Sequence, residues 1–360
     1  MQTKRMANRL LASGVFLAVS PLSVLAVVAG PAEGGGVEAP SLAPLRVGSF
    51  TVYTENDKYF AGTDQAYTNG FKFSYLSADL AQFSDPSVPA PVRGLSRTLG
   101  GVVREGADYR LGFSFGQNLY TPVNIATTLY QPKDRPYAAW LYAGVAFHVI
   151  DHERRYPMLD VFELNLGLVG PAALGEDVQN GFHDLIDVAQ ANGWRNQIND
   201  EPGVNVIWER RVRISSSVAR RGWVADFIPH AGLALGNVFT YANAGAEARA
   251  GWCLPGDFGS NLIRPSGDSN PGREARAPFG AFVFCAVDGR AVARDITLDG
   301  NTFSDSPSID KEPLVADLYA GIGLSTTNWQ LRYAQAYRTR EFKGQRSAQE
   351  FGSISVTLLF

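Results

Sequence analysis

The eight residues Tyr109–Gly116, YRLGFSFG, decide the fold class, because side chains of two kinds alternate along them. One set is large and apolar: Tyr109, Leu111, Phe113 and Phe115. The other set is small or charged: Arg110, Gly112, Ser114 and Gly116. Successive side chains of a β-strand point to opposite faces, so this stretch predicts a strand with one apolar and one polar face.

The same period of two returns in residues 71–75, 314–325 and 329–340. One face carries aromatic and aliphatic side chains and the other carries charges and glycines, as in strands with lipid outside and a polar lumen inside. We therefore expect an all-β fold, a 12-stranded antiparallel transmembrane β-barrel with a short helix in an extracellular loop. The expected strands are 47–55, 67–78, 108–118, 136–151, 157–169, 203–217, 222–237, 239–252, 276–291, 313–325, 327–341 and 349–360.

Residues 1–29 predict a secretory signal peptide, because three basic residues precede an apolar run that ends in small residues. Residues 30–45 are rich in Gly, Pro and Ala and predict a flexible lead-in, and residues 46–360 would form the barrel in the bacterial outer membrane. Removal of residues 1–29 leaves 29 basic and 35 acidic residues, a net charge of −6, which argues against nucleic acid as a partner. The two cysteines, Cys253 and Cys285, could pair in this oxidising compartment or remain free.

The order of the strands brings distant polar segments together. If both termini lie in the periplasm, the connections at 56–66, 119–135 and 170–202 all emerge on the extracellular side. They carry the candidate site residues Asn56, Asp57, Thr68, Lys133, Arg135, Gln179 and His183. We expect an active site at the extracellular rim, with the last two residues one turn apart on a helix from Gly175 to Ala189.

His183 is the candidate general base, because histidine titrates near neutral pH. Each candidate also has a structural interpretation when it is taken alone. A loop histidine is often only solvated, Asn56 and Asp57 suit a turn, and Arg135 suits a rim or lumen charge. A non-enzymatic porin or structural barrel is therefore the alternative to an enzyme.

Six ordered blocks of sequence carry a family resemblance over most of the chain. They are TENDKYFAGTDQAYTNG (54–70), GQNLYTP (116–122), KDRPYAAWLY (133–142), GLVGPAALGEDVQNGFH (167–183), GWRNQIND (193–200) and RTREFKGQ (338–345). In this order they resemble the LpxR-type lipid A 3'-O-deacylases of Gram-negative outer membranes. The resemblance implies a 12-stranded barrel that hydrolyses the 3'-acyloxyacyl ester of lipid A in the outer leaflet with the help of calcium.

The resemblance also implies roles for individual residues. His183 would be the general base on water, with Gln179 one turn before it and Asn56, Asp57 and Thr68 as polar groups of the site. Asp57, with Thr68 beside it, would be the nearest match to a calcium ligand, since calcium accepts carboxylate, amide and backbone oxygens. Lys133 and Arg135 would meet saccharide phosphates or pair within the lumen. A monomer or a weak dimer is expected.

One residue departs from the family resemblance, and two observations argue against other classes of lipid hydrolase. Ala189 stands where the family has a glutamate after the histidine, and Asp184 or Asp187 would have to replace it if the role exists. A serine lipase is suggested by G-x-S-x-G around Ser114, but that motif needs a strand, a sharp turn and a helix. The 12-stranded outer-membrane phospholipase uses His-x-Ser, which does not occur in this chain.

Overall fold

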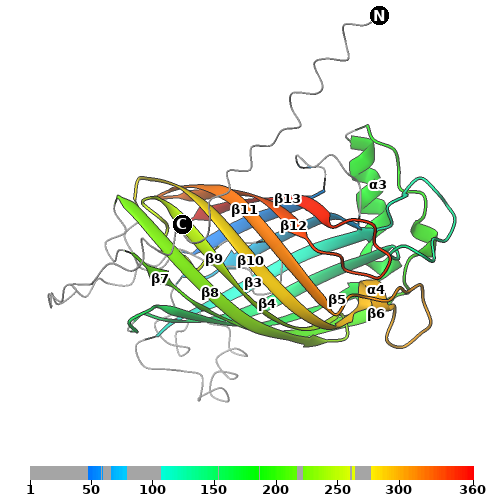
Figure 1. The fold of residues 1–360 in the computed structure, drawn as a ribbon, viewed down its shortest axis with the longest axis horizontal. Helices are drawn as coiled ribbons and strands as arrows, with labels where there is room; N and C mark the ends of the chain where they lie inside the picture. Colours follow the sequence, from blue (N-terminus) through cyan, green and yellow to red (C-terminus); the bar gives the residue numbers. More distant parts are fainter. Residues whose placement is uncertain are drawn as a thin grey trace, which may run out of the picture. The chain divides into compact units, whose positions relative to one another are not determined.

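The computed structural model describes residues 48–57, 59, 66–78, 107–152, 154–185, 187–216, 222–259, 262–263 and 277–360. The expected signal peptide (1–29) and lead-in (30–45) lie outside the described residues. One antiparallel sheet dominates the described part of the chain (Figure 1). Its strands are β1 (Ser49–Asn56), β2 (Ala66–Leu76), β3 (Asp108–Thr121), β4 (Ala138–Asp151), β5 (Met158–Val169), β6 (Glu201–Val212), β7 (Ile214–Ser215), β8 (Trp223–Gly236), β9 (Phe239–Trp252), β10 (Phe279–Asp295), β11 (Leu314–Thr326), β12 (Trp329–Arg338) and β13 (Gln349–Leu359). The helical elements are η2 (Pro171–Ala173), α3 (Gly175–Leu185), η3 (Trp194–Asn196) and α4 (Ile296–Asp299).

The sheet closes on itself, because β1 pairs with β13 and β6 pairs with β8. The two-residue strand β7 continues β6 beyond Arg213 and also pairs with β8. β6 and β7 therefore make one crossing of the wall, and the barrel has 12 crossings, as predicted. Closure leaves no strand edge without a hydrogen-bonding partner, which is the condition for spanning hydrocarbon. None of the described helices combines the length and apolar character needed to cross a membrane.

Strand β3 confirms the alternation that predicted the fold. Phe113 and Phe115 point outward and are 43% and 46% exposed, whereas Arg110 points inward and is 1% exposed. Ser114 also points inward, between Ser74 and Gly144, and β3 continues as a strand to Thr121. The strand, turn and helix of a serine-lipase nucleophile are therefore absent around Ser114.

The three predicted polar connections emerge at the same end of the barrel. β1, β3 and β5 run in one direction and β2, β4 and β6 in the other, so the connections that follow Asn56, Thr121 and Val169 share an end. α3 and α4 lie at this end, on the right of Figure 1. Longer connections face the cell exterior in outer-membrane barrels, so we refer to it as the extracellular end.

One detail differs from the prediction, and another decides between two alternatives that the sequence left open. α3 ends at Leu185 instead of Ala189, and Asp187 has a left-handed φ of 54°, a conformation that terminates helices. Cys253 and Cys285 are both free thiols.

Candidate active site on the outer wall of the barrel

The outer face of the wall changes from apolar to polar near the extracellular ends of β1, β2 and β3. Asn56 pairs with Asn69, and Asn69 pairs with Leu119, so these side chains share the outward face. One row closer to the membrane centre, Phe71 pairs with Gln117. Gln117 has the same outward parity as Phe113 and Phe115, yet it is buried. Something therefore covers the wall here.

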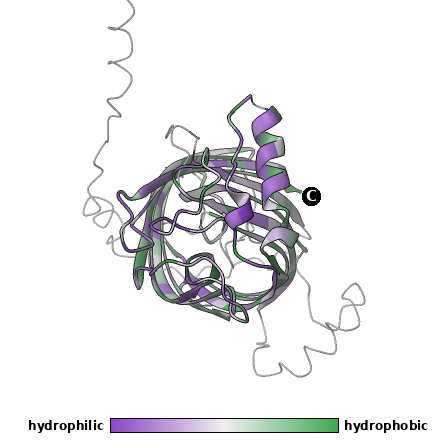
Figure 2. Ribbon diagram, turned by 90° about the vertical axis from the view of Figure 1, so that its right-hand side faces the viewer, coloured by the Kyte–Doolittle hydropathy of each residue, from purple (hydrophilic) through white to green (hydrophobic). Residues whose placement is uncertain are grey.

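The cover is the segment that contains η2 and α3. Figure 2 shows α3 outside the ring of strands. The side-chain amide of Gln117 donates a 2.6 Å hydrogen bond to the carbonyl of Ala173, and the backbone N–H of Gly170 donates one of 3.2 Å to Ala139. A Cβ atom on Gly175 would lie 2.7 Å from the Cβ of Ala139, so glycine permits the close approach of α3 to β4.

The helix lies at the extracellular end of the barrel, where the site was predicted. The helix packs against the outside of the wall because outward-facing residues of β3 and β4 form a buried apolar cluster with the extracellular loops. Its members are Leu119, Ile125, Tyr137, Ala139, Ala173, Ala191 and Trp194. A site beneath α3 therefore faces sideways, toward the surrounding leaflet.

Trp194 fixes the orientation of Gln179. The indole is fully buried, packs against the ring of Tyr137 at a centroid distance of 5.1 Å, and donates a 2.8 Å hydrogen bond to Oε1 of Gln179. An indole N–H only donates, so the oxygen of the Gln179 amide must face Trp194. The buried Nε2 of Gln179 meets no acceptor among the described residues, which leaves its N–H donors available for another group.

Tyr137 remains a neutral phenol beside this indole. Burial raises the pKa of Tyr137 to about 12, against a small opposing effect of its hydrogen bond with Gly193. A neutral, buried ring gives Trp194 a stable packing partner.

His183 lies one turn after Gln179 on the same buried face of α3 and is 3% exposed. Its Nδ1 lies 2.7 Å from the carbonyl oxygen of Ala189. A carbonyl only accepts, so Nδ1 carries a proton, and in the neutral imidazole Nε2 therefore has the lone pair. This is the tautomer that a general base requires.

The structure thus groups the predicted residues in two sets. Gln179 and His183 share the buried face of α3, and Asn56 lies with Asn69 on the outward face of the wall. Asp57 follows Asn56 in a turn and is fully buried. The ladder shifts register between Tyr67 and Asn69, which places Thr68 at a bulge, and its side chain lies outside the described residues.

Lys133 and Arg135 have different environments. Lys133 is exposed at the extracellular surface. Arg135 is fully buried, pairs with Glu341 at 3.0 Å, donates to Thr297 at 3.2 Å and stacks on Tyr120 at 4.6 Å. Arg135 therefore shows the lumen pairing that the sequence left as an alternative to phosphate binding.

The oxygens near Asn56 are of the kind that calcium binds. Asp57 offers a carboxylate and Asn56 and Asn69 offer amide oxygens, all hard ligands. The described residues contain no group of three or more His, Cys, Asp or Glu side chains that could hold a metal, so amide or backbone oxygens would have to complete the set. Asp184 and Asp187, the suggested substitutes for the family glutamate, are both exposed and do not join the buried face of α3.

Gln117 and Trp194 both lie in the quoted blocks, but no role for either was predicted from the sequence. Gln117 could have been identified from the sequence, because it is a polar residue on the same lipid-facing side of the strand as Phe113 and Phe115. Trp194 could not, since its contact with Gln179 joins two segments whose relative position the sequence does not define.

The closed barrel defines an integral outer-membrane protein, and α3 covers part of its outer wall. The chain belongs to the LpxR family, because the family model described as "Outer membrane protein LpxR" matches residues 16–360. Sequence comparison with curated proteins gives no match.

One solved structure supports the fold, and two others match more weakly. LpxR from Salmonella typhimurium matches with a TM-score of 0.69 and 18% identity, over 87% of this chain and 100% of that one. The β domain of the Bordetella autotransporter BrkA has a TM-score of 0.42 at 10% identity, over 88% of this chain and 100% of its own. An outer membrane channel from Pseudomonas putida F1 has 0.41 at 10% identity, over 90% of this chain and 100% of its own.

Proposed function

We propose that this protein hydrolyses the 3'-acyloxyacyl ester of lipid A, with His183 as the general base. Members of the LpxR family are outer-membrane lipid A deacylases, so the class of reaction follows from membership. The observation that supports His183 as the general base is the 2.7 Å contact between its Nδ1 and the carbonyl of Ala189. This contact leaves Nε2 available as the base on the buried face of α3.

The depth of the site suits an ester of a membrane lipid. Directly below the polar row of the outer wall lies a ladder of aromatic rings, in which Phe71 is 5.8 Å from Phe73 and 6.4 Å from Phe115. Aromatic side chains contact acyl chains, and amides such as Asn69 and Gln117 suit the headgroup region. The acyl esters of lipid A lie at this boundary between sugar and hydrocarbon.

The proposed reaction needs one proton-transfer group and donors for the oxyanion. Nε2 of His183 takes a proton from water as the water oxygen bonds to the ester carbon. The N–H groups of Gln179 and the amide of Asn56 would stabilise the negative oxygen. The imidazolium then returns the proton to the 3'-oxygen of the sugar as the C–O bond breaks, which releases the fatty acid and a free hydroxyl.

Calcium assistance remains part of the proposal. Asp57 and Thr68 would hold the ion, as the family resemblance implies, with amide or backbone oxygens as further ligands. A bound cation would polarise the ester carbonyl. Lys133 is the exposed cation that remains available for a saccharide phosphate.

The test is expression of the wild type and His183→Ala in a host that makes lipopolysaccharide, followed by mass spectrometry of the extracted lipid A. We expect loss of one acyloxyacyl group with the wild type and an unchanged spectrum with the variant. His152→Ala is the matched control, because His152 pairs with Asp108 at 3.2 Å at the opposite end of the barrel. Identical spectra for wild type and His183→Ala, with both proteins folded, would favour the structural-barrel alternative.

A further inference from the structure

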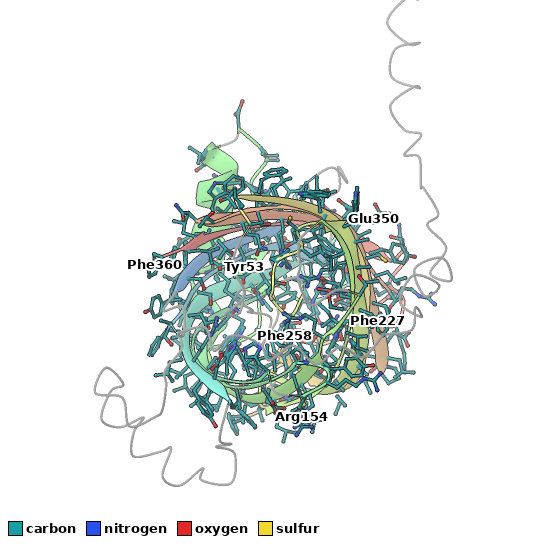
Figure 3. The ribbon with its side chains drawn as sticks, turned by 90° about the vertical axis from the view of Figure 1, so that its left-hand side faces the viewer. Tyr53, Arg154, Phe227, Phe258, Glu350 and Phe360 are labelled. Carbon is teal, nitrogen blue, oxygen red and sulfur yellow. The ribbon has the colours of Figure 1, made fainter. Side chains whose placement is uncertain are left out.

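The connection between β9 and β10 leaves the barrel wall at the end opposite α3, yet most of its described residues are buried. Leu254, Asp257, Phe258, Leu262 and Ile263 are all 9% exposed or less. Figure 3 shows Phe258 inside the ring of strands and Phe360 at its outer edge. The described residues 253–259 and 262–263 therefore fold back into the lumen.

Phe258 packs against the inner face of β4 and β5. Its partners form one buried cluster: Ala146, Ile150, Leu159 and Val161. The carbonyl of Phe258 also accepts a 3.3 Å hydrogen bond from Arg211 on β6, and the guanidinium of Arg213 stacks on the ring at 5.2 Å. Apolar packing and two cations thus fix this side of the segment.

Asp257 binds a different part of the wall. Its carboxylate accepts hydrogen bonds from Arg249 on β9 and Arg332 on β12, and a further one of 3.2 Å from Gln330. All these side chains are buried, so the ion pairs are shielded from water. Asp257 therefore binds the segment to β9 and β12, and Phe258 packs it against β4 and β5.

The far end of the segment reaches toward the extracellular half of the lumen. The backbone N–H of Ile263 donates a 2.6 Å hydrogen bond to Glu55, the residue before Asn56 on β1. Ile263 also lines a cavity of about 70 Å³ together with Asn118 and Tyr120 of β3. Contacts with strands on all sides of the ring mean that the segment occupies the centre of the lumen.

We propose that the described residues of this segment, 253–259 and 262–263, form an internal plug that closes the lumen to water-soluble molecules from the periplasmic end and is held in place by the carboxylate of Asp257. Barrels of 8 strands are filled by their own side chains and those of 16 to 18 strands enclose a channel, so a barrel with 12 crossings is intermediate in width and has room for a folded-in segment. Loss of the Asp257 charge leaves Arg249 and Arg332 buried without this partner, which favours release of the plug.

The test is the rate at which a polar thiol reagent labels a cysteine behind the plug. Ser353 is the reporter position, because it is buried on the inner face of β13 and pairs with Glu55 and Ala334. Ser353→Cys would be made in a full-length chain in which Cys253 and Cys285 are replaced by serine. We expect very slow labelling of this protein and a large increase when Asp257→Asn is added.

Two further variants keep the test decisive. Asp310→Asn is the matched control, since Asp310 is 80% exposed and pairs with Lys343 at the extracellular surface. Replacement of residues 254–259 by a Gly-Ser linker tests the plug if Asp257→Asn fails to fold. Equal labelling rates with and without the plug in folded barrels, or rapid labelling when the plug is intact, would overturn the proposal. Deacylation does not enter this measurement, so its outcome is independent of the proposed activity.

Discussion

Nδ1 of His183 lies 2.7 Å from the carbonyl oxygen of Ala189, so a backbone group orients the proposed general base. The chain makes this contact by leaving the helix after Leu185 and turning through Asp187, which has a φ of 54°. A backbone–backbone hydrogen bond of 2.9 Å, from the N–H of Val188 to the carbonyl of His183, closes the same turn. The ring is therefore held without the glutamate that the family resemblance implies at position 189.

Ala189→Glu should leave the deacylation rate within about twofold of the wild type, because the carbonyl remains and the new side chain points to solvent. His183→Ala in the same assay should lower the rate by about 10²–10⁴-fold, the usual contribution of a general base. Initial rates on purified lipopolysaccharide measure both. A large gain with Ala189→Glu would contradict the proposed role of the carbonyl.

Trp194→Phe should lower kcat by a larger factor than the factor by which it changes KM. The phenyl ring retains the packing against Tyr137, but Oε1 of Gln179 loses its donor in a buried position, at a cost of about 1–3 kcal/mol to the local structure. Steady-state kinetics and limited proteolysis of the extracellular segments report the two effects. Trp223→Phe is the control, since Trp223 is an exposed lipid-facing residue. Unchanged kcat would argue against positioning by Trp194.

Gly175→Ala should displace α3 from the wall and abolish most activity while the barrel stays folded. The added Cβ would lie 2.5 Å from the ring of Trp194 and 2.7 Å from Ala139. Gly181→Ala provides a control in the same helix, because a Cβ at Gly181 meets nothing within 4 Å. Activity and circular dichroism should be compared for both variants. Equal activity would mean that α3 does not need this close contact.

Asp57→Asn should weaken calcium binding and deacylation together. The substitution preserves size but removes the carboxylate that Asp57 offers to a cation. Calorimetry with calcium alone measures binding, and chelation followed by calcium addition should restore activity only in the wild type. Full activity of the wild type in excess chelator would exclude the metal from the mechanism.

The plug should stay closed as the pH falls from 7 to about 4. Burial pushes the pKa of Asp257 upward, but Arg332 and Arg249 outweigh burial and hold this pKa well below its usual range. A carboxyl with a lowered pKa stabilises the fold above its unfolded value of about 3.9, and this stabilisation is lost only as the pH falls through the folded value. The labelling rate of Ser353→Cys, corrected for reagent reactivity, should therefore remain low over this range. Faster labelling already at pH 5 would contradict the proposal that the Asp257 carboxylate holds the plug in place.

The wall of the barrel was predictable because each strand carries its own signal. Phe113 and Phe115 alternate with Ser114 and Gly116, and this local pattern fixes which side faces lipid wherever the strand lies. Parity then placed the connections around Asn56 and His183 at one end. Neither inference requires knowledge of distant contacts.

The packing of loops was not predictable for the opposite reason. The contact of Gln117 with Ala173 and that of Asp257 with Arg332 join segments far apart in sequence, and neither segment has a repeating pattern. The role of Arg135 was not predictable for the same reason. Its sequence context suits phosphate binding as well as the ion pair with Glu341 that it forms in the lumen. Local patterns define faces and ends, but not which loop covers which face.

A helix attached to the outside of the wall changes how a lipid would meet the enzyme. The substrate need not leave its leaflet, since two-dimensional diffusion along the bilayer brings it to α3 from the side. The encounter rate then depends on the mole fraction of substrate in the leaflet and on the viscosity of its neighbours. Dilution of the lipid with inert detergent should slow turnover even when the bulk concentration of lipid is constant.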